Sequence, residues 1–203
     1  MLPSKAQNHA TTAKLAKQAT VEQMTIEEFL AYMDSRPNGE RWELIEGVAI
    51  MNPSPTQWHQ TIAVNLVTWL SNHKKAVGAP WVPILGVGTR VPISPNSLPQ
   101  PDLYVQEGSP QPSPTTGDAL LIFEVLSKSN TKADRAWRRR VYASVPNCQH
   151  YVTISTKSAE ICRYDRADGW TGITVQGLEA RLVLPAIAAE IPLRDIYFDT
   201  QIK

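Results

Sequence analysis

The side chain with the clearest chemical interest is Glu124, because it lies in a nearly continuous apolar run at residues 119–126. A carboxylate buried in such a run is costly unless it is paired, protonated or bound to a metal. The two-residue alternation of a strand places Glu124 on the same face as Ile122 and Leu126, which are both apolar. The simpler interpretation is a strand-end Glu that faces solvent or pairs with a nearby arginine, and for an isolated Glu that interpretation is preferred.

A second carboxylate, Asp102, follows a proline at the entry to a short predicted strand, and Pro-Asp alone is a common turn signal. An Asp on one strand and a Glu in the middle of the next, however, are how an Mg²⁺-dependent nuclease holds its ion. Mg²⁺ binds one or two protein carboxylates and keeps places for waters and phosphate oxygens. A lysine near the second carboxylate would orient the attacking water or stabilise the developing charge. Asp102 and Glu124 together therefore predict a metal site for phosphodiester chemistry.

The elements that position these carboxylates are predicted from capping residues, apolar periodicity and proline breaks. Thr25 and Glu28 form a capping box that begins a helix through about Met33, and Thr56 caps a long helix over 57–75. The other expected elements are a hairpin at 41–51, extended pieces at 81–93 and 102–106, a surface loop at 109–116, a buried strand at 119–126, a helix at 131–143, and strands at 149–155, 159–164, 170–175 and 180–184. One strand–helix–strand unit, 119–155, predicts a mixed sheet with a right-handed crossover.

Several short motifs occur in order along the chain. They are Glu43-Leu44-Ile45-Glu46-Gly47, Pro53-Ser54-Pro55, His59 at the start of a helix, Pro101-Asp102, and Glu124-Val125-Leu126-Ser127 followed by Asp134-Arg135. As an ordered set they resemble the Uma-type restriction endonuclease family, which looks like a branch of the PD-(D/E)XK nuclease superfamily. The resemblance runs from about Met24 to Asp199.

The resemblance implies a fold of the α/β (α+β) class with a restriction endonuclease-like core. This core is a mixed sheet of four to five strands flanked by helices, and the sequence adds further C-terminal strands. The resemblance also implies Asp102 and Glu124 as ligands of Mg²⁺, with Mn²⁺ as an alternative ion, and Glu43 as a third acid. His59 would lie close to the site, where an imidazole can bind a metal or a phosphate or act as a base. An exposed helix residue is the equally weighted alternative for His59.

One position departs from the superfamily pattern. A lysine is expected two residues after Glu124, and this chain has Leu126 there. The family's downstream lysine position is occupied by Arg138, which can bind phosphate but is a poor proton acceptor because its pKa exceeds about 12. Lys128 could supply an ammonium group instead, and Lys132 is a third candidate.

Positive charge is concentrated between Lys128 and Arg140, which holds six basic residues and one acid. Beside a metal site such a segment would attract a polyanion. Helical spacing places Asp134, Arg135, Arg138 and Tyr142 on one face, with Ala133, Trp137 and Val141 directed inward. We expect phosphate contacts, which carry no base specificity, from Lys132, Arg135 and Arg139. The alternative is an ordinary solvated helix face.

Composition limits the remaining options. The chain has 203 residues, 42% of them hydrophobic, and a formal net charge of +1, so it can bury a core and its net charge selects no partner. The lysine-bearing, acid-free start favours a poorly ordered basic tail over 1–22, followed by one domain over 23–200. Two cysteines without metal-site spacing fit a cytoplasmic location, and no apolar run reaches the length of a membrane span.

The leading hypothesis is an Mg²⁺-dependent DNA endonuclease that hydrolyses phosphodiester bonds. Duplex DNA is the expected partner, and a homodimer is one form in which two sites would cut two strands. The missing lysine motivates an alternative, a catalytically inactive nucleic-acid-binding module on the same fold. A third hypothesis is a protein-interaction domain without a nucleic-acid role. No base-reading element is identifiable, so no recognition sequence is predicted.

Overall fold

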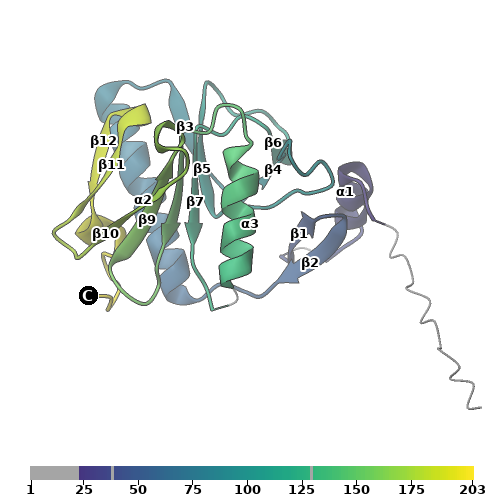
Figure 1. Cartoon of the computed structure of the whole chain (residues 1–203), viewed down its shortest axis with the longest axis horizontal. Helices are drawn as coiled ribbons and strands as arrows, with labels where there is room; N and C mark the ends of the chain where they lie inside the picture. The colour runs from purple at the N-terminus through teal and green to yellow at the C-terminus, as the bar shows by residue number, and fades with distance from the viewer. Residues whose placement is uncertain (1–22, 38, 129) are drawn as a thin grey trace, which may run out of the picture.

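A six-stranded mixed sheet is the central layer of the protein, shown in Figure 1. The computed structural model describes residues 23–37, 39–128 and 130–203. The strands, in spatial order, are β10 (Gly172–Gln176), β9 (Glu160–Asp165), β8 (His150–Ile154), β7 (Leu121–Val125), β5 (Leu103–Glu107) and β3 (Trp81–Leu85). Strands β7 and β8 pair in parallel, and the other neighbours are antiparallel. The predicted mixed sheet is therefore confirmed.

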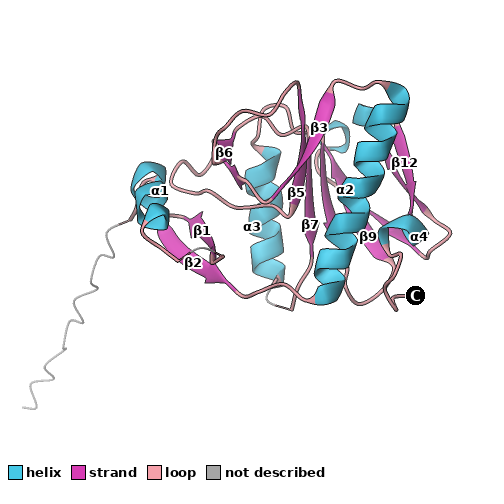
Figure 2. Cartoon of the chain, turned by 180° about the vertical axis from the view of Figure 1, so that it is seen from behind, coloured by secondary structure: helices cyan, strands magenta, loops and turns pink. Residues whose placement is uncertain are grey.

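Helices cover both faces of this sheet. Helix α2 (Gln57–Val77) and the short helix α4 (Leu193–Ile196) lie on one face, as Figure 2 shows, and helix α3 (Lys132–Ala143) lies on the other. The buried residues form two large clusters accordingly. One cluster joins α2 and α4 to Phe123 and Val125, and the other joins α3 to Ile122 and Tyr151. The predicted alternation along β7 is thus observed, with Glu124 on the α3 side.

Helix α2 begins and ends where its sequence directs. The Thr56 hydroxyl accepts the His59 N–H at 3.3 Å, which satisfies one of the free amides of the first turn. Residues four apart, Ile62, Leu66 and Leu70, are all buried against the sheet. The helix ends at Gly78, whose φ of 64° gives the left-handed cap that glycine adopts without strain. It extends two residues beyond the predicted end at 75.

Helix α3 connects β7 to β8 and is capped by Thr131, whose hydroxyl accepts the Asp134 N–H at 3.1 Å. Val141 is buried and Trp137 is half-buried, as expected, but Ala133 is exposed. The prediction for Ala133 was wrong, because the buried residues of α3, Arg138, Val141 and Tyr142, all lie in its second half. Arg138, expected on a charged face, is buried instead.

A smaller unit lies beside the main sheet, on the right of Figure 1. It consists of α1 (Ile26–Asp34) and the hairpin of β1 (Arg41–Ile45) and β2 (Val48–Asn52). The predicted capping box is present, since Thr25 and Glu28 exchange hydrogen bonds. Leu44, the fourth residue of β1, is fully buried and pairs with Leu98, which ties the hairpin to the main body.

Two segments differ from the expected elements. The extended piece predicted at 81–93 divides, because Gly86 has a φ of 59° that ends β3. The chain then forms β4 (Gly88–Thr89), which pairs in parallel with β6 (Thr115–Thr116). Strand β6 lies within the segment 109–116, which was predicted to be a surface loop. Near the C-terminus, β11 (Arg181–Leu184) pairs with β12 (Ala189–Pro192), a strand that was not predicted. The expectation of additional C-terminal strands is confirmed.

Two expectations concern the ends and the environment of the chain. The basic tail predicted at 1–22 lies outside the described residues. Across the described ranges, none of the helices has the combined length and apolar character that a bilayer crossing requires.

The packing of α2 makes a direct prediction for stability. Ile62→Ala should lower the free energy of unfolding by about 2–5 kcal/mol, because Ile62 has no exposed surface and its loss leaves a cavity. Val64→Ala is the matched control, since Val64 is 55% exposed on the same helix and should change stability by less than about 0.5 kcal/mol. Urea unfolding of the two variants measures the difference, and equal losses would contradict the assignment of the buried face.

Candidate active site

Asp102 and Glu124 lie close together at one end of the sheet, where β5 begins and β7 ends. Strands β5 and β7 pair with Leu103 opposite Phe123, so the next antiparallel step places Asp102 opposite Glu124. The Val125 N–H donates to Asp102 Oδ2 at 2.8 Å, which joins the two strands at this point. The side chains are almost buried, with exposed fractions of 9% for Asp102 and 7% for Glu124.

Asp102 is held by two further side chains. His59, in the first turn of α2, lies with Nε2 3.1 Å from Oδ2, and Arg41 Nη2 donates to Oδ1 at 3.2 Å. Burial alone would raise the pKa of Asp102, but the hydrogen bond and charge of His59, the Val125 amide and Arg41 outweigh it and lower that pKa. Asp102 is therefore kept as a carboxylate. The other ring nitrogen of His59, Nδ1, is buried without a hydrogen-bond partner among the described residues.

Glu124 is paired with Arg138, whose guanidinium is shared among three acids. Nη1 of Arg138 lies 3.0 Å from both Glu43 Oε1 and Glu124 Oε1, and Nη2 lies 2.6 Å from Glu43 Oε2. Nε donates to Asp134 Oδ1 at 3.2 Å, one helical turn away. Burial alone would lower the pKa of Arg138, but the neighbouring negative charge, with Glu124 foremost, raises it. The guanidinium is a permanent cation here.

The protonation of Glu124 follows from this crowding. Tyr142 donates its hydroxyl to Glu124 Oε1 at 2.8 Å, beside the Arg138 contact. Burial raises the pKa of Glu124 to about 8, and the charges of Asp102 and Glu43 add to it, while Arg138 and Tyr142 oppose it. Three carboxylates share one guanidinium, so one of them is disfavoured in its charged form. The pKa of Tyr142 is also raised, chiefly by burial, and its hydroxyl stays a donor.

Glu43 reaches the site from the peripheral hairpin. It lies on β1 and is buried, and its Oε1 also accepts the Gln100 N–H at 2.6 Å. Gln100 precedes Asp102 by two residues, so the loop before β5 holds Glu43 and Asp102 in one hydrogen-bonded group. The Leu44–Leu98 bridge beside it fixes the hairpin in place. Glu43 thus enters through tertiary contacts between distant segments.

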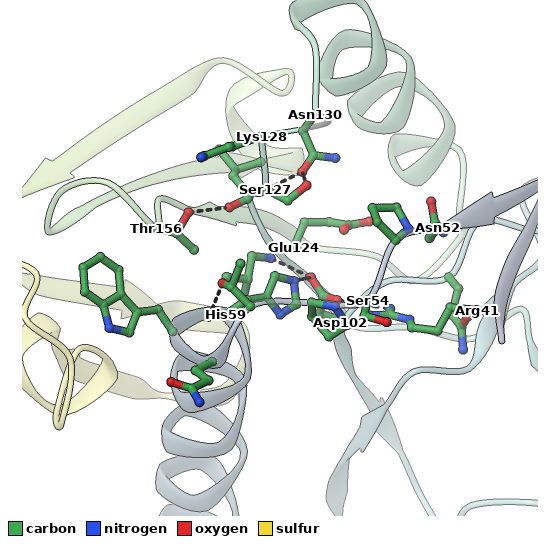
Figure 3. Close-up of a pocket in the computed structure, with 18 of the residues that line it drawn as sticks. Arg41, Asn52, Ser54, His59, Asp102, Glu124, Ser127, Lys128, Asn130 and Thr156 are labelled. Atoms are coloured by element: carbon green, nitrogen blue, oxygen red, sulfur yellow. Dashed lines mark hydrogen bonds and ion pairs between the residues drawn. The ribbon is translucent and has the colours of Figure 1, made fainter. Parts of the chain in front are cut away.

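These side chains line a cavity of about 880 Å³ at the ends of β7 and β8 and the start of α2. Figure 3 shows His59, Asp102 and Glu124 together above α2, with Lys128 and Asn130 on the opposite side of the cavity. Trp58, 41% exposed, and the Asn52–Thr56 segment form another part of the wall. The hollow is large enough for a nucleotide-sized group.

The structure brings most of the predicted site residues to this cavity. Six of them line it: Glu43, His59, Asp102, Glu124, Lys128 and Arg138. The three predicted nucleic-acid contacts, Lys132, Arg135 and Arg139, line a second cavity on the other side of α3. The expectation of one shared charged face on α3 was therefore wrong for Arg135, because Arg138 points to the carboxylates while Arg135 lies at the second cavity.

Sequence reasoning missed Arg41, Tyr142 as a partner of Glu124, and Lys157. Arg41 and Lys157 both line the main cavity. Lys157 follows β8, which is parallel to β7. Because the ends of parallel neighbours meet at one edge of a sheet, the predicted strand–helix–strand unit could have indicated that Lys157 lies near Glu124. No sequence signal indicated Arg41 or the hydroxyl of Tyr142.

Asp102 and Glu124 are the two carboxylates of the described site that could bind a hard cation such as Mg²⁺. Within the described residues, no three His, Cys, Asp or Glu side chains form a metal-binding group. Each carboxylate oxygen has two lone pairs. Oε1 of Glu124 and Oδ2 of Asp102 each have two partners, whereas Asp102 Oδ1 has only Arg41 and Glu124 Oε2 has none within the described ranges. Asp102 Oδ1 and Glu124 Oε2 could therefore bind an ion, and Mg²⁺ needs no more than one or two carboxylates.

Comparisons with known proteins identify a similar fold and a family. The chain is similar to a crystal structure described as "a putative nuclease belonging to DUF820" from Anabaena variabilis ATCC 29413, with a TM-score of 0.70 and 18% sequence identity. The match covers 86% of this chain and 97% of that one. The profile of the family Uma2, described as "Putative restriction endonuclease", matches residues 26–194, and the chain belongs to this family. Comparison with curated proteins gave no match.

The buried ion cluster predicts a large effect of removing its cation. Arg138→Met should lower the free energy of unfolding by about 3–5 kcal/mol, because the buried Glu43 would lose its counter-ion and Glu124 would lose a hydrogen-bond donor. Arg140→Met is the control on the same helix, since Arg140 is exposed and has no ion pair within the described ranges. Adding Glu43→Gln to Arg138→Met should recover part of the loss. Urea unfolding tests all three, and a loss below about 1 kcal/mol for Arg138→Met would contradict the cluster.

Proposed function

We propose that this protein is an Mg²⁺-dependent endonuclease that hydrolyses phosphodiester bonds of DNA. The observation that carries the proposal is the position of Asp102, directly before β5, beside Glu124 on the neighbouring strand β7, with both carboxylates lining the main cavity. Membership of the Uma2 family supports a nuclease function at the level of the class. The ion, the DNA substrate and the residue roles below are parts of the proposal.

Asp102 and Glu124 would hold the ion through the two oxygens that keep free lone pairs. Bound Mg²⁺ would polarise the phosphorus–oxygen bond and neutralise the developing charge. Glu124 would give up its proton to the solvent as the ion binds, since ligands bind metals in their deprotonated form. Mn²⁺, which also prefers oxygen ligands, would serve in its place.

His59 and Arg41 would act by fixing the orientation and the charge of Asp102. Both contact its carboxylate directly, and His59 is rigidly placed because it lies in the capped first turn of α2. Such pre-organisation keeps the ligand in position before the substrate arrives. Nδ1 of His59, which lacks a partner within the described residues, could form a hydrogen bond with a water or a substrate group.

Lys128, rather than Arg138, is the better carrier of the positive charge that the missing lysine would have supplied. Arg138 has five N–H donors, and its contacts with Glu43, Glu124 and Asp134 use four of them. Lys128 is exposed at the cavity wall and has no ion pair with a described residue. Its ammonium group would therefore contact the phosphate, and Arg138 would chiefly organise the carboxylates.

A catalytically inactive nucleic-acid-binding module is the second candidate. The observation that favours it is the pairing of every site carboxylate with a basic side chain of the protein itself. In that case the acids would serve the internal ion cluster, and DNA would bind without a metal. The two predictions below separate the candidates.

Metal-dependent nicking is the first of these predictions. The purified protein should relax supercoiled plasmid with Mg²⁺ or Mn²⁺ and not with EDTA, and Glu124→Gln should slow the reaction on the order of a hundredfold. Glu107→Gln is the matched control, because Glu107 is exposed at the opposite end of β5 from Asp102. Nicking that is equally fast in Glu124→Gln would refute the assignment of Glu124, and activity in EDTA would refute the role of the ion.

Binding of the ion itself can be measured without substrate. Mg²⁺ should raise the midpoint temperature of thermal unfolding of the wild-type protein, because a ligand that binds only the folded state stabilises that state. At a Mg²⁺ concentration of a hundred times the dissociation constant, the free energy of unfolding should rise by about 2.7 kcal/mol. Asp102→Asn should abolish the shift, since it removes a charged ligand while keeping the shape of the side chain. The Glu107→Gln control should keep it. A wild-type protein that binds DNA but shows no Mg²⁺ shift would favour the inactive module.

A further inference from the structure

The second cavity lies between α3 and the part of the sheet formed by β8 and β9. Its volume is about 360 Å³, less than half that of the main cavity. Lys132, Arg135 and Arg139 contribute from the helix, and Thr153, Ser155 and Tyr164 contribute from the strands and the turn after β8. The helix side of the wall therefore carries cations, and the sheet side carries hydroxyl groups together with the carboxylate of Glu160.

The basic residues of α3 divide into two groups with different surroundings. Arg138 is enclosed by carboxylates, as described above. Lys132, Arg135 and Arg139 have no ion pair within the described ranges, so their charges are available to an outside anion. Their spacing of three and four residues places them along one side of the helix, over a rise of about 10 Å. At about 3.4 Å of axis per phosphate of one strand, this stripe matches roughly three phosphates.

Tyr164 gives this cavity a rigid aromatic side. Its ring stacks on Tyr151, with centroids 5.7 Å apart, and the Arg139 guanidinium lies 5.2 Å from its centroid. Burial raises the pKa of Tyr164 to about 12, although Arg139 and Arg135 oppose this effect, so its hydroxyl remains a hydrogen-bond donor at neutral pH. The acid in the cavity, Glu160, is already bonded to the Gln176 amide at 2.6 Å.

The second cavity is adjacent to the candidate active site. Leu126, the first residue after β7, lines both cavities. Lys128 and Lys157 line the main cavity, from the segments that follow β7 and β8. A chain of phosphates leaving the main cavity would therefore pass these lysines and reach the stripe of Lys132, Arg135 and Arg139.

We propose that the second cavity is a phosphate-binding subsite that holds the backbone of a polynucleotide strand on one side of the scissile bond. Lys132, Arg135 and Arg139 supply the charge, and the Tyr164 and Ser155 hydroxyls supply hydrogen bonds to phosphate oxygens. The subsite reads no bases, since phosphate contacts fix position and not sequence. This inference rests on the proposed function, because it assigns the path of the substrate through the same site.

The test compares two arginines of α3 that carry the same charge. Binding of a fluorescent 20-nucleotide single strand and of its duplex is measured by anisotropy, in EDTA, over a range of salt concentrations. Arg135→Gln should weaken binding about fivefold at 0.1 M salt and reduce the salt slope by about 0.7 for the single strand and 0.9 for the duplex, the loss of one phosphate contact. Arg140→Gln should have a much smaller effect, because Arg140 is exposed on the same helix and lines neither cavity. Arg135→Lys should keep the slope.

Each outcome decides the inference separately from the nuclease proposal. Equal effects of Arg135→Gln and Arg140→Gln would overturn the subsite, since general electrostatic attraction would then explain binding. Absence of binding to either probe by the wild-type protein would overturn both proposals. A selective effect of Arg135→Gln without any plasmid nicking would support the subsite and reject the nuclease. Circular dichroism of the variants, which change only side chains outside the core clusters, confirms that they fold.

Discussion

The Arg138 guanidinium, enclosed by three carboxylates, is the interaction on which the site depends. It connects α3 to the peripheral hairpin through Glu43 and to the central sheet through Glu124. A buried cation of this kind is stable only while its acids are in place, and the acids tolerate burial only beside the cation. The geometry of the main cavity therefore follows from one ion cluster, which holds together three segments that are distant in the sequence.

The same cluster sets the electrostatics of the two facing carboxylates. Asp102 has its own partners, His59 and Arg41, and its pKa is lowered, whereas Glu124 shares Arg138 with other acids and its pKa is raised. The pKa values of two neighbouring carboxyl groups are thus shifted in opposite directions. A divalent cation would relieve the repulsion between them, and without one the site is balanced by the protein's own basic side chains. This balance is why a nuclease and an inactive binding module are both credible outcomes for one geometry.

Helix α3 serves two purposes because its basic residues point in different directions. Arg138 faces the acids of the candidate active site, and the stripe of Lys132, Arg135 and Arg139 faces a polar wall of hydroxyl groups that also contains Glu160. A position on the helix, and not the number of charges, decides whether an arginine is internal or available to a ligand. The local segment after β7 therefore supplies both the interior of the site and the surface beside it.

Local signals in the sequence predict most of the elements. Capping residues, apolar periodicity and the strand–helix–strand unit predict the main helices and the parallel β7–β8 pair. The apolar run around Glu124, the Pro101-Asp102 motif and the family resemblance nominate Asp102 and Glu124 as the candidate metal ligands. Three outcomes are visible only in the folded chain. Arg138 pairs with Glu43 and Glu124, Arg41 binds Asp102 while Tyr142 binds Glu124, and Ala133 is exposed. Those outcomes depend on contacts between segments up to 95 positions apart, and helical spacing cannot show which face of α3 meets an acid from another element.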